Sequence, residues 1–305
     1  MQSGSCGENL RWKLDDEVLT ISGTGEMENY FYKHNPPWRD CMKSIQRVVI
    51  GKNVATIGTE AFQCCSKLTW VTIPNAVTLI GESAFNTCKN LRRLDIGKGV
   101  ETIGSKAFIL CNNLSNIIIG DNVKVIGDGA FNGCENAHDL TISDSVETIG
   151  EAAFANCKSL TEVTIPDSVK TIGECAFTDC ENLKSVTIGN GVETIGRFAF
   201  FGCTQLKNLT IGDGIKNIDN WAFPFCDCGN PTIFDGRNVI WCLEDGVLVL
   251  KKDPYAKSDA DFSTGEVTWR FIEKNIRGVK VERGIKPTEK FFEWLAASGK
   301  QISFE

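Results

Sequence analysis

A unit of 23 residues recurs through the middle of this chain with no insertion or deletion between copies. Each copy follows the pattern V-x-x-I-G-x-x-A-F-x-x-C-x-x-L-x-x-V-x-I with few departures. Eight copies begin at Val54, Val77, Val100, Val123, Val146, Val169, Val192 and Ile215. The cysteine of each copy stands eleven residues further on, from Cys65 to Cys226. A fixed period of this length predicts a solenoid, in which each unit stacks on the next.

The end of each unit predicts a short strand. In Leu-x-x-Val-x-Ile the valine and the isoleucine stand two residues apart, so both side chains face the same side of a strand. Stacked copies would place these strands side by side in a curved parallel sheet with a spacing of about 4.8 Å. A single unit cannot bury its own apolar side, so each unit must pack on its neighbours and the two ends need caps.

The segment Ala-Phe-x-x-Cys predicts a short helical turn on the side opposite the sheet, with its phenylalanine and cysteine facing inward. We expect the phenylalanines, beginning with Phe62, to stack in the core and the cysteines to form a ladder of small buried side chains. A zinc site is the alternative for the cysteines, but zinc ligands come two to four residues apart, whereas these recur once per unit. The glycine after the isoleucine, as in Gly58, is expected to take a positive φ.

This pattern resembles the BspA-type (treponemal-type) leucine-rich repeat, and the resemblance extends over residues 45–226. The segment CGENLRWKLDDEVLTISGTG, with Pro37-Trp38 after it, also resembles the leader module found before such repeats. The family consists of bacterial surface proteins, with relatives in some parasitic protists. The resemblance implies a mainly β leucine-rich-repeat solenoid used in adhesion and protein binding, and it supplies no catalytic residues.

Three domains are expected. Residues 1–44 should form an N-terminal β cap, because two alternating segments around Asp15-Asp16 predict a hairpin. Residues 45–228 should form the solenoid, with a half coil ahead of the eight units that begin at Val54. Residues 229–305 are expected to be a diverged copy of the cap module.

The expectation of a second cap module rests on matched positions in the two segments. Val239–Leu250 repeats the pattern of Leu10–Ile21, and Trp269 corresponds to Trp38. A short helix is expected at Phe291–Leu295.

Charge and motif content exclude several function classes. The net charge of −7 argues against nucleic acid and anionic membranes as partners. No apolar run approaches the length needed to cross a bilayer, so we expect no direct membrane insertion. His34 and His138 belong to different structural units, and no nucleophile elbow, phosphate loop or H-E-x-x-H motif occurs. We therefore expect no enzyme activity, no catalytic residue, no metal and no cofactor.

The N-terminal segment MQSGSCGENLRWKL lacks the apolar core of a signal peptide. The chain is therefore expected to be either a cytoplasmic protein or a mature form whose signal has been removed. The resemblance favours the second alternative, and with it an extracellular or cell-surface location.

Ligand binding is expected where the units differ, because the core positions are constant while the outward strand positions vary. Trp and Arg are enriched among binding hot spots, and Trp70 stands among arginines in the early units. Packing of Trp70 against the cap is the alternative. The threonines of the later units are explained by strand propensity. The expected ligand-binding residues are Arg47, Trp70, Arg92, Arg93, Asp95, Asn116 and Ile118.

We expect a non-enzymatic module that binds a protein on its sheet face, with a host extracellular-matrix or serum protein as candidate ligand. A structural spacer or assembly segment of a longer surface protein is one alternative. A glycan-binding module is another, although it would require rows of exposed aromatic residues and only Trp70 fits. Cys41 and Cys64 stand 23 residues apart, so a disulfide could join the cap to the first coil, unless a reducing environment leaves both thiols free.

Overall fold

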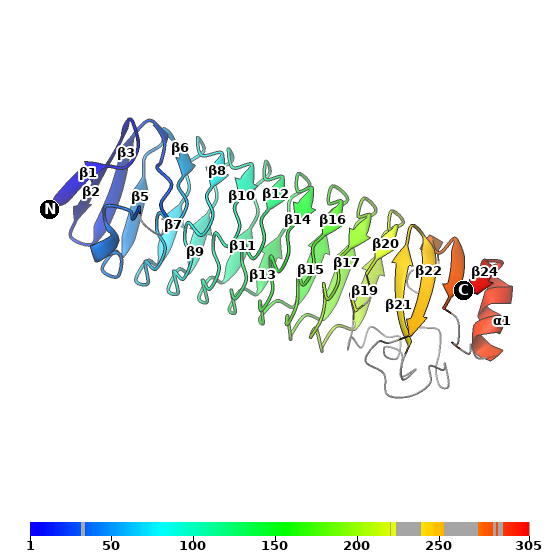
Figure 1. Cartoon of the computed structure of the whole chain (residues 1–305). Helices are drawn as coiled ribbons and strands as arrows, with labels where there is room; N and C mark the ends of the chain where they lie inside the picture. Colours follow the sequence, from blue (N-terminus) through cyan, green and yellow to red (C-terminus); the bar gives the residue numbers. More distant parts are fainter. Residues whose placement is uncertain are drawn as a thin grey trace.

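The structure, a computed structural model, describes residues 1–31, 34–219, 221–223, 239–252, 274–282, 285 and 289–304. The chain winds into a solenoid whose coils stack in a nearly straight row in the view of Figure 1, so the curvature expected of the sheet is slight there. The N-terminal strands lie at one end of the row, and helix α1 (Glu289–Ser298) lies at the other. The solenoid predicted from the repeat, and its mainly β character, are confirmed.

The V-x-x-I segments form a parallel ladder that we call the continuous face. This ladder was not predicted from the sequence, because most of its strands are two residues long and too short to show a period. Its first nine strands are β4 (Gly25–Glu26), β6 (Val54–Ile57), β8 (Leu79–Ile80), β10 (Thr102–Ile103), β12 (Val125–Ile126), β14 (Thr148–Ile149), β16 (Thr171–Ile172), β18 (Thr194–Ile195) and β20 (Asn217–Ile218).

The L-x-x-V-x-I segments form the strands predicted from the sequence, on a side that we call the interrupted face. These strands are β5 (Arg47–Ile50), β7 (Trp70–Thr72), β9 (Arg93–Asp95), β11 (Asn116–Ile118), β13 (Asp139–Thr141), β15 (Glu162–Ile165), β17 (Ser185–Ile188) and β19 (Asn208–Ile211). Parallel pairing joins β7 to β9, β11 to β13, and β15 to β17 and β19. No ladder joins β5 to β7, β9 to β11 or β13 to β15, all of which lie in the described part of the chain.

The segments from the glycine to the cysteine form a third side, which we call the turn ridge. They are turns rather than the short helical turns expected, because two residues have positive φ in each segment that the structure describes in full, as do Glu60 (54°) and Cys64 (60°). Left-handed residues placed at this spacing stop a helix from propagating. They also point backbone N–H groups along the solenoid axis toward the next coil. Phe62 N–H, for example, donates to the Ala84 carbonyl of the next coil at 2.8 Å.

The glycines that follow the isoleucines are required by close packing between coils. The expectation of a positive φ is wrong for Gly58, Gly81 and Gly104, none of which adopts one. A Cβ on Gly104 would lie 2.7 Å from the carbonyl oxygen of Ile80 and 2.8 Å from the backbone nitrogen of Glu82. A side chain is therefore excluded because the backbones of neighbouring coils touch at this point.

The predicted aromatic stack is confirmed. Ring centroids of successive copies from Phe62 to Phe223 lie between 4.9 and 5.5 Å apart. The cysteine ladder is also confirmed, since every ladder cysteine from Cys65 to Cys203 is fully buried. The thiols also form hydrogen bonds that the sequence did not indicate. Cys88 Sγ donates to the Phe62 carbonyl of the preceding coil at 3.2 Å, and the later ladder thiols repeat this contact.

The N-terminal cap contains the hairpin predicted from the sequence. Strands β2 (Leu10–Asp15) and β3 (Val18–Gly23) pair in antiparallel fashion. The turn between them has positive φ at both central residues, Asp16 and Glu17, as a type I′ turn requires. Strand β1 (Gln2–Ser5) pairs with β2, and β3 pairs in parallel with β5, which joins the cap to the first coil. A short 3-10 helix, Arg39–Cys41, precedes β5.

The C-terminal strands repeat the strand order of this cap. Strands β21 (Val239–Glu244) and β22 (Val247–Lys252) form an antiparallel hairpin, and β22 pairs in parallel with β23 (Gly278–Val281). Strand β21 extends the continuous face by pairing with β20, and β24 (Gln301–Phe304) pairs with β23 at the far edge.

We propose that the chain has the three domains expected, with boundaries after residues 44 and 228. The shared order of the two hairpins and the parallel strand after each supports a second cap module. Trp269 and the ladder residue Cys226 lie outside the described residues. The helix expected at Phe291–Leu295 lies within α1.

Candidate functional site

The outward positions of the interrupted face carry exposed side chains where strand alternation predicted them. Trp70 is 43% exposed, so the cap does not bury it, and Ile118 is 60% exposed. The other five residues expected to bind a ligand lie on the same face and are exposed except for Asp95, which is half-buried: Arg47, Arg92, Arg93, Asp95 and Asn116.

Three of these side chains form a cluster, which we call the Trp70 cluster. The indole Nε1 of Trp70 donates to Asp95 Oδ2 at 3.0 Å. Arg93 Nε donates to Asp95 Oδ1 at 3.0 Å, and its guanidinium carbon lies 5.4 Å from the centroid of the Trp70 ring. Because β7 and β9 are paired, Trp70 and Arg93 are direct cross-strand neighbours, a geometry that allows the cation–π contact.

The carboxylate of Asp95 is the centre of the Trp70 cluster. Partial burial raises the pKa of Asp95, but hydrogen bonds from Arg93 and Trp70 outweigh it and hold that pKa below its ordinary value. Asp95 is therefore ionised at neutral pH and accepts both hydrogen bonds. An indole held from two sides has fewer rotamers to lose when a partner covers it.

The remaining expected residues stand apart from the Trp70 cluster. Arg47 lies on β5, across a ladder break from Trp70. Asn116 and Ile118 lie on β11, across the next break, and Asn116 pairs with Asp139 of β13. Arg92 precedes β9, and its backbone N–H donates to the Thr69 carbonyl at 2.9 Å.

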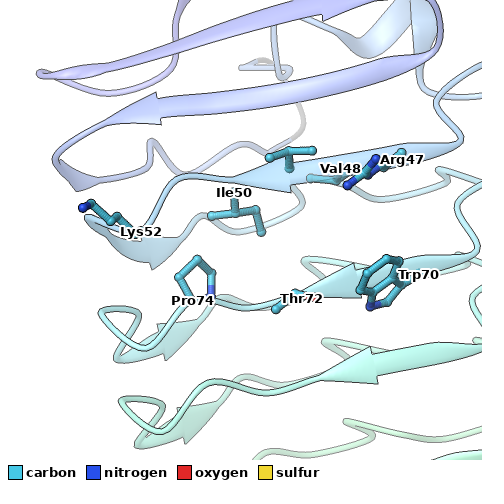
Figure 2. A pocket seen from close by; sticks show the side chains of 8 residues that line it. Arg47, Val48, Ile50, Lys52, Trp70, Thr72 and Pro74 are labelled. Carbon is cyan, nitrogen blue, oxygen red and sulfur yellow. The ribbon is translucent and has the colours of Figure 1, made fainter.

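A pocket of about 290 Å³ lies at the break between β5 and β7 (Figure 2). Arg47 and Trp70 stand at one end of it, and Lys52 and Pro74 stand at the other. Its floor and walls are mostly aliphatic, and the full set of lining residues is Arg47, Val48, Val49, Ile50, Lys52, Trp70, Thr72 and Pro74. The sequence did not indicate this pocket, although two of its lining residues, Arg47 and Trp70, were expected to bind a ligand.

Pro74 removes one hydrogen bond between the coils at this break. In three coils the residue after the strand is a glycine that donates its N–H to the preceding coil, as Gly189 does to the Ile165 carbonyl at 2.8 Å. Gly51 makes the same bond to Ile21 at 2.9 Å. Proline has no N–H, so this bond between the β7 coil and the β5 coil is absent.

A second proline stands at the break between β13 and β15. Pro166 occupies the position of Pro74 in its own coil, and a cavity of about 510 Å³ lies beside it. At the break between β9 and β11 the equivalent residues are Ile119 and Gly120, so this break has no proline. An Ile-Pro pair in place of Ile-Gly is thus a sequence signal for two of the three breaks.

The cysteines are inert in this setting. Burial raises the pKa of Cys65, Cys111 and Cys157 to about 12, so their thiols stay protonated at neutral pH. Cys41 and Cys64 are both free thiols, so the possible disulfide does not form in this structure. Trp38 stacks on Phe62 and so takes the position of a repeat phenylalanine. Cys41 stands three residues after Trp38, as Cys65 stands three residues after Phe62, so Cys41 is equivalent to Cys65 and not to Cys64.

Two features are absent among the described residues. No group of three or more His, Cys, Asp or Glu side chains is placed to hold a metal ion there. In the same residues, no helix combines the length and the apolar character that a bilayer-spanning segment needs.

A family model described as the BspA type leucine rich repeat region matches the chain in 6 copies, over residues 38–161 and 124–239. The fold is similar to that of a leucine-rich-repeat protein of T. pallidum, at 28% identity and a TM-score of 0.51, covering 66% of this chain and 90% of that one. It is also similar to a leucine-rich-repeat protein of Bacteroides ovatus, at 24% identity and a TM-score of 0.56, covering 98% and 76%. No curated protein sequence matches the chain. The matched family and both structures are described as repeat proteins rather than as enzymes.

Proposed function

Because the chain belongs to the BspA-type leucine-rich-repeat family, we propose that it is a non-enzymatic module that binds another protein on the interrupted face around Trp70. The observation that carries this proposal is an indole that is 43% exposed and yet fixed by Asp95 and Arg93. Trp and Arg are the side chains most enriched in binding hot spots.

The surroundings of Trp70 suit a protein partner. The aliphatic pocket between β5 and β7 can accept an apolar side chain, while Arg47 and Lys52 at its edges can pair with carboxylates. An apolar centre with a charged rim is the usual arrangement of a protein interface. The backbone around it is held by stacked coils, so binding should require little ordering of the chain.

We place this module on the bacterial cell surface or outside the cell, with a host extracellular-matrix or serum protein as the candidate ligand. The family supports this placement, since its members are surface proteins. A structural spacer remains the second candidate. The described strands of the continuous face support that alternative, because they join the repeats to the C-terminal module in one sheet.

The test is binding of the purified chain to immobilised matrix and serum proteins at physiological salt. We expect a saturable interaction that Trp70→Ala weakens at least tenfold, which corresponds to about 1.4 kcal/mol. Asp95→Asn should weaken it less, because the amide keeps the shape of the cluster but loses its charge. Leu79→Ala is the matched control, since Leu79 is 39% exposed but lies on the continuous face.

Two results would contradict the proposal. A ligand whose affinity survives both Trp70→Ala and Arg93→Ala binds elsewhere on the protein. A panel with no saturable ligand would favour the spacer.

A further inference from the structure

The charges of the interrupted face are divided into two halves. The half built on β5, β7 and β9 carries five exposed cations, which we call the basic half: Arg47, Lys52, Arg92, Arg93 and Lys98. The half built on β11, β13 and β15 carries five exposed carboxylates, which we call the acidic half: Asp121, Asp139, Asp144, Glu162 and Asp167. The one carboxylate of the basic strands, Asp95, is already paired with Arg93. The two halves have opposite charge and the same number of coils.

This division makes the face complementary to itself. Consider a second copy rotated by 180° about an axis that lies in the interface and runs parallel to the strands. Its coils then run in the reverse order, while each outward strand position faces the same strand position of the first copy. With the axis between β9 and β11, Arg47 of one copy lies opposite Glu162 of the other. By the same operation Lys52 faces Asp167, and Lys98 faces Asp121.

We propose that the interrupted face is a self-association surface, on which two copies of this chain pack face to face with their solenoid axes antiparallel. Each of these three charge pairs then occurs twice, as the symmetry of a two-fold dimer requires. The inference names a partner for the face proposed above and rests on that face being a protein-binding surface.

The charges select one register. An axis that passes through β9 would place Lys98 opposite its own copy, and an axis through β11 would place Asp121 opposite its own copy. Like charges that face each other directly are unfavourable, so both registers are disfavoured. Two copies with parallel solenoid axes would bring each half onto itself and are disfavoured for the same reason.

The ladder breaks agree with this register. The break between β5 and β7 lies opposite the break between β13 and β15 of the other copy, and the third break lies on the axis. The pocket beside Trp70 therefore faces the cavity beside Pro166. Trp70 itself faces the strand of Asp139, whose carboxylate is exposed.

The area available predicts a weak dimer. Six coils at about 4.8 Å and seven residues at about 3.3 Å give a face of roughly 29 by 23 Å. That buries roughly 1,300 Å² in total, which is at the lower end of specific interfaces. Because the pairs are at an exposed surface, added salt should weaken the association.

The experiment is sedimentation velocity on the purified chain from about 1 to about 200 µM, in NaCl at about 50 mM and about 500 mM. We expect a concentration-dependent dimer at low salt whose dissociation constant rises at least tenfold at high salt. Arg47→Glu and Glu162→Arg should each weaken the dimer at least tenfold. The double variant should restore it, because the charge pair is reformed with its sign reversed.

Lys184→Glu is the matched control, because Lys184 is exposed beside β17 and lies outside the paired coils. A second exchange, Lys98→Glu with Asp121→Lys, tests the register next to the axis. A chain that stays monomeric at about 200 µM in low salt would overturn the proposal. So would double variants that remain folded by circular dichroism but fail to recover the dimer.

The two proposals fail separately. If a matrix or serum protein binds the chain, Trp70→Ala abolishes that binding and the chain is monomeric, ligand binding is supported and self-association is ruled out. A salt-sensitive dimer with no ligand in the panel would support self-association and remove the host ligand.

Discussion

The indole of Trp38 stacks on the ring of Phe62, with centroids 5.7 Å apart and 15° between the planes. Its Nε1 also donates to the Ala61 carbonyl at 2.8 Å. Trp38 belongs to the cap, and it occupies the place that a phenylalanine of a preceding coil would take. The cap therefore extends both the aromatic stack and the hydrogen bonding of the array by one residue.

Replacing Trp38 should weaken the whole array. We expect Trp38→Ala to lower the free energy of unfolding by about 3 to 5 kcal/mol, because it leaves a cavity beside a fully buried ring. Trp38→Phe keeps the stack and loses the hydrogen bond to Ala61, so it should cost about 1 to 2 kcal/mol. Urea unfolding followed by circular dichroism measures both. Equal losses in the two variants would contradict the role given to the stack.

Two glycines at different contacts provide a matched pair. A Cβ on Gly104 would lie 2.7 Å from the Ile80 carbonyl oxygen, whereas a Cβ on Gly120 would meet nothing nearer than 3.9 Å. We expect Gly104→Ala to destabilise the protein by about 1 to 3 kcal/mol, because adjacent coils must move apart. Gly120→Ala should stay within about 0.5 kcal/mol of the parent. A neutral Gly104→Ala would show that the coils can separate without penalty.

The cysteine ladder predicts loss of stability in alkali. Burial raises the pKa of Cys65, Cys111 and Cys157 to about 12, from a value of 9.0 in the unfolded chain. Below about pH 9 these thiols are protonated in both states, and the ladder contributes its full stability. Above it the unfolded chain releases protons that the folded chain retains, so stability falls until the pH reaches the folded pKa.

The expected loss is about 1.4 kcal/mol per ladder thiol for each pH unit above about 9. Urea midpoints between about pH 8 and pH 10 measure it. Cys157→Ala should reduce the loss of stability per pH unit by the contribution of one thiol. A midpoint that does not change over this range would contradict the burial of the ladder.

Cys64 and Cys65 are neighbours in sequence with opposite exposure. Cys64 is exposed on the turn ridge, while Cys65 is fully buried in the ladder. Mild alkylation of the native protein at neutral pH should modify Cys64 and leave Cys65 unmodified, because reaction requires an accessible thiolate. Peptide mapping by mass spectrometry distinguishes the two sites. The same treatment in denaturant should label both, and equal labelling in the native state would contradict the structure.

The repeat made the coil, its period and its core predictable. Identical residues at a fixed interval must occupy equivalent positions, so the burial of Phe62 and Cys65 in one coil implies the burial of their copies. The turn ridge was less predictable. Most of its left-handed positions are occupied by residues such as Glu60, Cys64 and Thr87, and glycine stands at only three of those in the described residues, Gly129, Gly133 and Gly202, so the sequence signal for positive φ is weak.

The candidate site was likewise predictable only in part. Strand alternation predicted that Trp70 and Arg93 would face outward, since outward positions follow from a period of two. The sequence did not indicate that both would converge on Asp95, because that depends on the pairing of β7 with β9. The pocket lies beside Pro74, which has no N–H to donate, and this signal is visible only by comparison with the coils that have a glycine at the same position.

The turn ridge gives the array a direction. At each of six coil boundaries from Glu60 to Phe201, three backbone N–H groups point toward the C-terminal neighbour and three carbonyls point back. The peptide dipoles of this side therefore add, and the N-terminal end of the ridge presents bare acceptors. Tyr30 N–H and the Trp38 indole supply donors to the first two, the carbonyls of Thr59 and Ala61. The order of donors and acceptors is the same at each of these six boundaries, so two such ridges could continue each other end to end only head to tail.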